Sequence, residues 1–387
     1  MIDRSTPMTA PPPPPVAPLP EGAARKAVDA LLLDWVAAAL AGETRTPPRL
    51  DAAAWDDLVA QLRIHRLVGL IWPVVSGSAG AMPASALAGL AAFRDLATRM
   101  NGANLMTMRR VLPAFAAAGL PVVAFKGPLI QQAAYGGLFI RPSSDIDLLV
   151  HPRDFDRAAD LLDAEGYGLA PRCRSLWWRL FLGERHFLPR RPAEATIDLH
   201  LRLQQPGAPL PRLAAAFLEA REVSVVGGAP LPVLSARHQL LLCAMSFVKA
   251  LHHREPALRY VVDYAALAAR LDPAADQALE AEAARQGLRA SLALTRRAAA
   301  MLTLAPPRPS SSASPWEGPP TAPTWLSDAD LRALILRPDA PDARWPRRRR
   351  LLWALSDRPG EALGGVAFMA AGEVARRLLQ RRPGGAR

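Results

Sequence analysis

The sequence predicts an α+β fold, in which a small mixed sheet is flanked by N-terminal helices and a C-terminal helical domain. Half of the 387 residues are hydrophobic, alanine is abundant and aromatic residues are few, which favours helices over most of the length. Between residues 119 and 210 the pattern changes to short apolar, β-branched runs separated by turn residues. Such runs, alternating with helical stretches, are typical of a sheet.

Three helical stretches are expected before the sheet, at residues 23–41, 51–75 and 84–118. Asp51 is a candidate N-cap for the second stretch, and Gly119 follows the third as a C-cap glycine does. The third is either one helix or two helices broken near Asn101-Gly102. Together they form an N-terminal helical region, 23–118. The Pro-rich leader before it, residues 1–22, is expected to be disordered.

The α/β core is expected between residues 119 and 210. Its predicted strands are 121–126, 145–150, 186–189 and 196–201. The last two are interpreted as a hairpin. A short helix that ends at Tyr135 follows the first strand, and an amphipathic helix, 154–165, follows the second.

Helices return after the core. A helical domain is expected at 211–304, with its clearest helices at 239–251 and 255–271. We expect a linker at 305–325 and then a basic C-terminal region, 326–387, that contains one helix, 361–379.

Three acidic residues carry the chemical prediction. Asp145 and Asp147 stand two apart at the start of a strand, so both carboxylates point to the same face. Asp198 sits in a predicted strand that could lie beside it. Carboxylates held this close repel one another unless a cation lies between them. Oxygen ligands suit Mg²⁺, so we expect two Mg²⁺ ions, or Mn²⁺, and phosphoryl or nucleotidyl transfer. Asp198 could instead act as the general base.

A phosphate side is predicted next to these carboxylates. Lys126 and Gly127 follow the first strand, where glycine lets a phosphate approach the backbone. Ser143 and Ser144 could donate to phosphates or only shape the turn, and Lys126 could be no more than an exposed strand end. Only three of the 47 basic residues are lysines, which draws attention to Lys126 and Lys249.

Two further residues remain open at this point. His200 lies two positions after Asp198 on the same face, where it either touches substrate or a carboxylate or is a satisfied structural histidine. Arg141 is either a phosphate contact or a salt-bridge partner of the aspartates.

Charge and composition bound the partners. The net charge is +12, and residues 342–387 alone hold 11 Arg and 4 acidic residues. This Arg-rich tail is either a solvated surface or a weak site for nucleic acid or an anionic membrane surface. The two cysteines do not have the spacing of metal ligands. The sequence also shows no signal-peptide pattern and no apolar run long enough for a transmembrane segment. We therefore expect a cytoplasmic protein.

These motifs together resemble the uncharacterised nucleotidyltransferase family, part of the DNA polymerase β-like nucleotidyltransferase superfamily. The resemblance covers about residues 50–270. It rests on Leu62–Leu67, Phe125-Lys126-Gly127, Tyr135, Arg141, Asp145–Val150, Gly166-Tyr167, His186, Ile197–His200 and Leu258–Asp263.

The resemblance implies a nucleotidyltransferase-type sheet, with Asp145 and Asp147 as the metal-binding pair and Asp198 as the third carboxylate. It also implies that a lysine of the helical domain, Lys249, contacts the triphosphate. One departure is that Gly127 precedes a proline, not the serine usual in the superfamily, and that it lies further from Asp145. Ser143 and Ser144 are the candidates to replace that serine.

The expected activity is Mg²⁺-dependent transfer of an NMP from an NTP such as ATP to a hydroxyl on an unknown acceptor, which could be a small molecule, peptide, protein or RNA. Two alternatives stay open. One is a catalytically weak nucleotide-binding or antitoxin-like partner protein. The other is an RNA-tailing enzyme that holds RNA through the Arg-rich tail.

Overall fold

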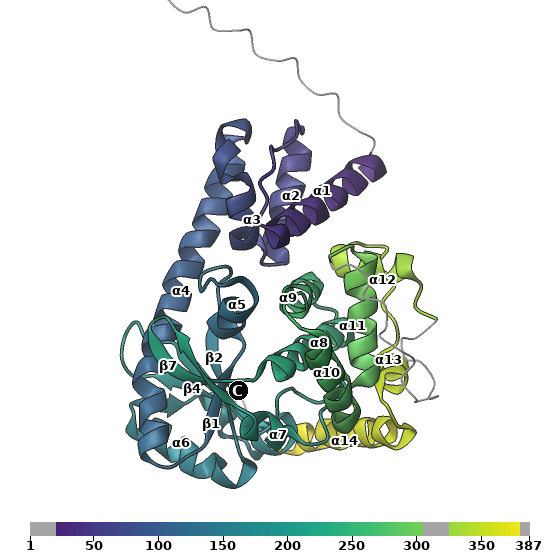
Figure 1. Cartoon of the computed structure of the whole chain (residues 1–387). Helices are drawn as coiled ribbons and strands as arrows, with labels where there is room; N and C mark the ends of the chain where they lie inside the picture. The colour runs from purple at the N-terminus through teal and green to yellow at the C-terminus, as the bar shows by residue number, and fades with distance from the viewer. Residues whose placement is uncertain (1–20, 305–324, 380–387) are drawn as a thin grey trace, which may run out of the picture.

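The computed structural model describes residues 21–304 and 325–379 (Figure 1). The predicted leader therefore lies outside the described residues except for its last two positions. The predicted linker lies outside them except for Trp325.

One mixed sheet of seven strands lies at the centre of the described part of the chain, and the predicted α+β class is confirmed. The strands are β1 (Val122–Phe125), β2 (Asp145–Val150), β3 (Tyr167–Leu169), β4 (Glu184–Pro189), β5 (Thr196–His200), β6 (Glu222–Val226) and β7 (Ala229–Val233). Their spatial order is β3-β4-β5-β2-β1-β7-β6. The β2–β5 and β1–β7 pairs are parallel, and the other neighbours are antiparallel, including the predicted β4–β5 hairpin.

Three of these strands were not predicted from the sequence. The β6–β7 hairpin lies after residue 210, in the stretch expected to be helical. Pro230 and Pro232 argue against a strand there, because proline cannot donate to a ladder. The structure tolerates them because β7 meets β1 only briefly, at Val233 beside Ala124. β3 is only three residues long, too short for a periodic signal.

The N-terminal helices are α1 (Glu21–Ala41), α2 (Ala52–Ile64), α3 (Val68–Val75) and α4 (Ala84–Ala117), with a 3₁₀ turn, Ser76–Ala81, before α4. Asp51 caps α2, as predicted, by accepting from the Ala54 amide. The single helix predicted over 51–75 is wrong: the chain breaks between α2 and α3, where Arg66 has a φ of +56°. The stretch 84–118 forms one unbroken helix, without the break considered near Asn101.

The core helices are α5 (Gly127–Tyr135) and α6 (Phe155–Ala164), with single turns at Pro152–Asp154, Pro171–Arg174 and Trp178–Leu182. The helices after the core are α7 (Ala214–Glu219), α8 (Ala236–His253), α9 (Leu258–Ala268), α10 (Pro273–Gln286) and α11 (Arg289–Met301). The C-terminal region contains α12 (Asp328–Leu336), α13 (Arg348–Leu355) and α14 (Pro359–Leu379). Only α14 had been expected there, because α12 and α13 are short and lie among prolines and arginines.

The two faces of the sheet are buried in different cores. Ile146 and Leu148 of β2 pack with Ile197 of β5 against α4 and α6. Leu149 of β2 belongs instead to the large core shared by α1–α3, α5 and the C-terminal helices. Figure 1 shows α4 and α6 on one side of the sheet and α8 and α9 beyond the other. Since strand side chains alternate, Asp145 and Asp147 face the same side as Leu149, toward the helical domain.

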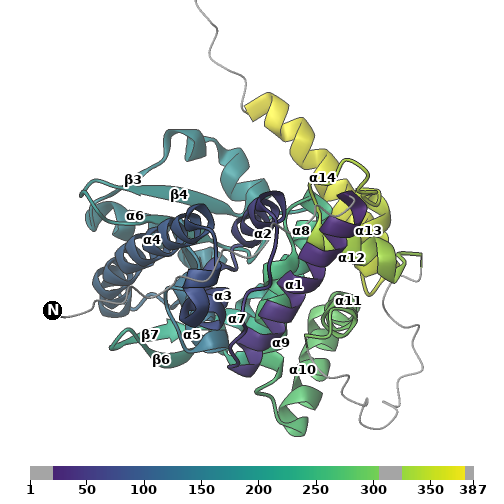
Figure 2. The same cartoon turned by 90° about the horizontal axis from the view of Figure 1, so that it is seen from above.

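The N-terminal helices are tied to the C-terminal region. The His65 ring, fully buried after α2, donates from Nε2 to the Leu336 carbonyl at 3.0 Å. The next residue, Arg337, pairs with Asp29 of α1 and Asp57 of α2. Figure 2 shows α1 running alongside the helices near α12. No helix among the described residues is long and apolar enough to cross a membrane.

Candidate active site

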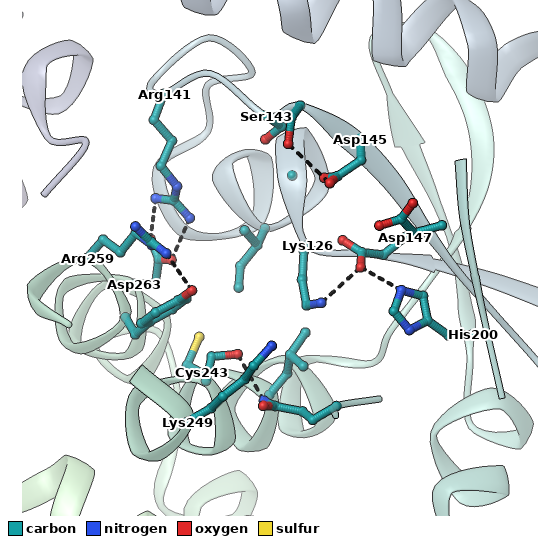
Figure 3. A pocket seen from close by; sticks show the side chains of 18 of the residues that line it. Lys126, Arg141, Ser143, Asp145, Asp147, His200, Cys243, Lys249, Arg259 and Asp263 are labelled. Atoms are coloured by element: carbon teal, nitrogen blue, oxygen red, sulfur yellow. Dashed lines mark hydrogen bonds and ion pairs between the residues drawn. The ribbon is translucent and has the colours of Figure 1, made fainter. Parts of the chain in front are cut away.

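A pocket of about 300 Å³ opens between the sheet and α8 and α9, a size suited to a small-molecule ligand. All eight residues selected from the sequence line it: Lys126, Gly127, Ser143, Ser144, Asp145, Asp147, Asp198 and Lys249. They come from the junction of β1 and α5, the loop before β2, β2 itself, β5 and α8. Figure 3 shows Lys126 near the middle, with Asp145 and Asp147 on one side and Lys249 below.

The three aspartates lie on one face of two neighbouring strands. Asp147 stands directly beside Asp198 in the parallel register of β2 and β5, and Asp145 stands beside Thr196 at the end of β2. Asp147 and Asp198 are each 8 % exposed. The position of the Asp198 strand beside the Asp145–Asp147 strand is therefore as the sequence predicted.

Two cationic or polar groups hold Asp147. The Lys126 ammonium donates to Asp147 Oδ1 at 2.9 Å, and His200 Nε2 lies 2.9 Å from the same oxygen. Burial alone would raise the pKa of Asp147, but Lys126 and His200 outweigh burial and hold that pKa well below its usual range. The open choice for His200 is thus resolved toward a carboxylate contact.

The pKa of Asp145 is shifted in the opposite direction from that of Asp147. Burial, followed by the nearby charges of Asp147 and Asp198, raises the pKa of Asp145 to about 6. The Ser144 hydroxyl donates to its Oδ2 at 3.1 Å but does not compensate. A carboxylate crowded by two others in this way is stabilised by an added cation.

Asp198 is held by His186, which the sequence analysis had quoted for the family resemblance without giving it a role. His186 Nδ1 donates to Asp198 Oδ1 at 2.5 Å, and its Nε2 lies 3.4 Å from Glu184. Burial disfavours the imidazolium, but the contacts with Asp198 and Glu184 prevail and raise the pKa of His186 to about 9. Glu184 also lies 3.6 Å from His200 and so connects the two histidines beneath the aspartates.

The side chains at this site are of the kind that binds a hard divalent cation, but they do not converge on one point. Three carboxylates with adjacent strand positions supply the oxygen ligands that Mg²⁺ prefers. In the described chain, however, no three acidic, histidine or cysteine side chains converge on one point. Each aspartate has its own protein partner: Lys126 for Asp147, Ser144 for Asp145 and His186 for Asp198.

The phosphate side begins at a strained turn. Lys126 follows β1 and is the N-cap residue of α5, with φ +63° and ψ −156°, a conformation that non-glycine residues rarely adopt. Gly127 follows at φ +52° and starts α5, and a Cβ placed on it would lie 3.4 Å from the Ser143 hydroxyl. Strain of this kind persists where the surrounding structure holds it, and here it directs the lysine at Asp147.

A family model now identifies the chain. The model described as uncharacterised nucleotidyltransferase matches residues 51–303, well over half of the 387 residues. The chain belongs to the uncharacterised nucleotidyltransferase family. This match confirms the resemblance and the enzyme class, a nucleotidyltransferase, inferred from the sequence.

Other comparisons add little. No curated protein matches the sequence. One solved structure, the antibiotic-resistance factor ANT(2'')-Ia, is similar to the chain with 14 % sequence identity and a TM-score of 0.33. The likeness covers 47 % of this chain and 91 % of that one.

In this nucleotidyltransferase two asparagines of α4 position the loop that leads to the aspartates. Asn101 donates to the carbonyls of Leu138 and Arg141 and accepts from the Ser143 amide. Asn104 donates to the carbonyls of Ser143 and Asp145. Both side chains are fully buried. In the sequence, Asn101 drew attention only together with Gly102, as a possible helix break, and Asn104 was not singled out.

Arg141 corrects a second expectation. Its guanidinium is bidentate to Asp263 of α9, at 2.7 and 2.6 Å, and the Tyr135 hydroxyl donates to the same carboxylate at 2.6 Å. From the sequence we expected Arg141 to contact either a phosphate or the site aspartates, and Asp263 had not been considered as a partner. Sequence separation hid this partner, although both residues stood among the motifs of the resemblance.

Lys249 lies on α8, across the pocket from the sheet, and is half-buried. Among the described residues no carboxylate pairs with it, so its ammonium is available to an anionic ligand. Gln204, Gln205, Arg66 and Arg259 also line the pocket and were not selected from the sequence. They come from three separate segments. Arg66 and Arg259 lie within the Leu62–Leu67 and Leu258–Asp263 motifs of the resemblance but were given no role there.

Proposed function

We propose that this family member transfers an NMP from an NTP to a hydroxyl of an acceptor, with a divalent cation as cofactor. The observation that carries the proposal is the strand register: Asp147 lies beside Asp198, with Asp145 two residues earlier on the same face. This acidic edge meets Lys126 and Lys249 in one pocket. Carboxylates for cations beside ammonium groups for phosphates are the components of nucleotidyl transfer.

In the proposed reaction the acceptor oxygen bonds to the α-phosphorus while the bond from that phosphorus to the β-phosphate oxygen breaks, and pyrophosphate leaves. Asp145, Asp147 and Asp198 would hold the Mg²⁺ or Mn²⁺ ions. Bound cations would neutralise triphosphate charge and make the acceptor hydroxyl more acidic. Asp198 is also the candidate that takes the hydroxyl proton, since His186 holds one of its oxygens in place.

The triphosphate would lie along the opposite wall. Lys126 and Lys249 supply point charges there, and Ser143 and Ser144 supply hydroxyl donors. At the start of α5 a phosphate oxygen could reach only the Gly127 amide. Pro128 has no N–H, and the Leu129 and Ile130 amides already donate to the Lys126 carbonyl. If Asp147 held a cation, Lys126 would be free to turn from Asp147 to the phosphates.

The test uses each radiolabelled NTP in turn with Mg²⁺ or Mn²⁺, purified protein and a cell extract, and the labelled product is identified by mass. We expect one product, lost by at least 10²-fold in Asp145→Asn and Asp147→Asn. Asp154→Asn, a change to a buried carboxylate outside the pocket, is the matched control. Undiminished labelling by both site variants would refute the proposal.

A second candidate function, nucleotide binding with little or no catalysis, is favoured by one observation. Lys126 already neutralises Asp147, as a protein cation would in a site that seldom binds metal. This candidate expects nucleotide affinity that is equal with and without Mg²⁺ and that survives Asp145→Asn. Calorimetry of both proteins with and without EDTA separates the two candidates.

A further inference from the structure

Two arginines line the pocket without a carboxylate partner among the described residues. Arg66 comes from the turn between α2 and α3, and Arg259 from the first turn of α9. Arg66 is exposed to the pocket, whereas Arg259 is half-buried. They come from elements outside the sheet that carries the aspartates.

Three buried or half-buried arginines elsewhere in the chain are paired with carboxylates. Arg141 binds Asp263, Arg110 binds Glu194 and Arg337 binds Asp57, all within 2.9 Å. Arg66 instead lies in the electrostatic field of another arginine. Burial lowers the pKa of Arg66, and the positive charge of Arg259 lowers it further. Tyr260 and Asp145 act on Arg66 in the opposite direction but form no ion pair with it. Two positive charges in one pocket, neither of them paired with a carboxylate, favour binding of an anion.

The turn that presents Arg66 is held from three sides. Arg66 itself has a φ of +56°, which costs a non-glycine residue about 1 kcal/mol or more. Its neighbours His65 and Leu67 are both fully buried. Gly69, in the next turn, packs so closely on the loop before β2 that a Cβ there would meet the Ile140 carbonyl at 2.2 Å. The arginine is therefore directed into the pocket by a rigid, strained turn.

Arg259 is held just as firmly. Its guanidinium carbon lies 4.4 Å from the centroid of the Tyr260 ring, and Nη2 donates to the Tyr260 hydroxyl at 2.7 Å. Figure 3 shows Arg259 close to Asp263, on the side of the pocket away from Asp147. Asp263 accepts three hydrogen bonds from Arg141 and Tyr135, and Arg259 forms no ion pair with it.

We propose that Arg66 and Arg259 form an anion-binding subsite that takes a phosphate group of a substrate. A planar guanidinium group binds two phosphate oxygens at once. The Arg259 guanidinium is already held by Tyr260 before a ligand arrives. The same chemistry occurs at the terminal phosphates of an NTP and at a phosphomonoester on an acceptor. Only the assignment to a substrate rests on the proposed nucleotidyl transfer; anion binding itself does not.

The first experiment measures binding without metal or catalysis. Full-length protein in EDTA is titrated calorimetrically with tripolyphosphate, which represents the NTP phosphates, and with phenyl phosphate, which represents an acceptor monoester. We expect Arg66→Gln and Arg259→Gln to weaken at least one ligand about tenfold, the loss of roughly 1.4 kcal/mol. Arg63→Gln, an exposed arginine one turn earlier on α2, is the matched control and should change binding less than twofold.

The pattern of losses identifies the source of the phosphate. If the arginine variants bind tripolyphosphate more weakly, the subsite belongs to the NTP. If they bind only phenyl phosphate more weakly, it belongs to the acceptor. Wild-type affinity for both ligands in both variants would overturn the subsite. Arg66→Gly, which relieves the positive φ while removing the side chain, guards against a folding defect and should reproduce the Arg66→Gln result.

The same titrations on Asp145→Asn/Asp147→Asn protein separate this proposal from the catalytic one. If nucleotidyl transfer is wrong but the subsite is right, this double variant and wild type both bind the anion, and the arginine variants do not. If the subsite is wrong, the arginine variants match Arg63→Gln whatever the outcome of the labelling experiment.

Discussion

Arg141 and Asp263 form a buried bidentate ion pair that joins the loop before β2 to α9, with Nη1 and Nη2 2.7 and 2.6 Å from the two carboxylate oxygens. The pair is 122 positions apart in the chain and almost fully buried at both ends. It fixes the helical wall of the pocket relative to the sheet wall. Burial opposes the charge of Arg141, but Asp263 prevails and raises the arginine pKa above its usual range.

Arg141→Gln should lower the free energy of unfolding by about 3–5 kcal/mol, because it leaves the Asp263 carboxylate buried without its counter-charge. Urea denaturation followed by circular dichroism measures the change. Arg190→Gln, which breaks an exposed ion pair with Asp163, is the control and should cost about 1 kcal/mol or less. Adding Asp263→Leu to an Arg141→Met variant should recover much of the loss; a double variant as unstable as Arg141→Gln would contradict this account.

Gly69→Ala should destabilise the protein by about 1–3 kcal/mol, because the new methyl group would collide with the Ile140 backbone. The same change at Gly102, where no atom lies within 4 Å, removes a helix-interior glycine and should stabilise by about 1 kcal/mol. Thermal unfolding of the two variants gives opposite shifts. Equal shifts would mean that α3 does not pack on the loop as described.

His65 predicts a loss of stability on acidification. Burial lowers its pKa from 6.5 to about 4, despite the hydrogen bond to Leu336. Between pH 6.5 and pH 4 the histidine is therefore protonated in the unfolded chain but neutral in the folded protein. The free energy of unfolding falls as the pH drops from about 6.5 to 4. This histidine alone accounts for about 2 kcal/mol between pH 7.5 and pH 5.

The test of His65 compares His65→Gln with wild type by urea denaturation at both pH values. Other buried histidines, including His252, also favour neutrality, so the difference between the two proteins isolates His65. We expect the variant to be less stable at pH 7.5 but to lose about 2 kcal/mol less on acidification. Parallel pH curves would show that His65 is not the group responsible.

Lys126→Met should strengthen Mg²⁺ binding in the absence of nucleotide, since it removes the ammonium group paired with Asp147. The gain should be roughly tenfold, because two charges about 4 Å apart interact by about 1–4 kcal/mol near a protein surface. Calorimetry measures it, with the exposed Lys26→Met as control. Nucleotidyl transfer should fall in the same variant. Weaker Mg²⁺ binding would show that the ammonium does not compete with the cation.

Local chemistry made part of this fold and site predictable. The Asp145–Val150 strand and the Asp198 strand were each identified from a few neighbouring residues, and their pairing followed from a hydrophobic pattern that must face one core. The break at Arg66 was not predictable, because the positive φ there depends on His65 reaching α12. The β6–β7 hairpin was missed because its prolines are acceptable only beside the short contact with β1.

The sequence by itself determined the acidic edge: residue spacing on a strand obliges Asp145 and Asp147 to share a face, and its motifs identified the family. Only the tertiary structure decided what each of these groups contacts. Asp147 holds Lys126, Arg141 holds Asp263, and Arg66 and Arg259 are left without carboxylate partners in the described chain. Periodicity describes neighbours along one element, whereas these pairings join segments whose separation in sequence carries no information about distance.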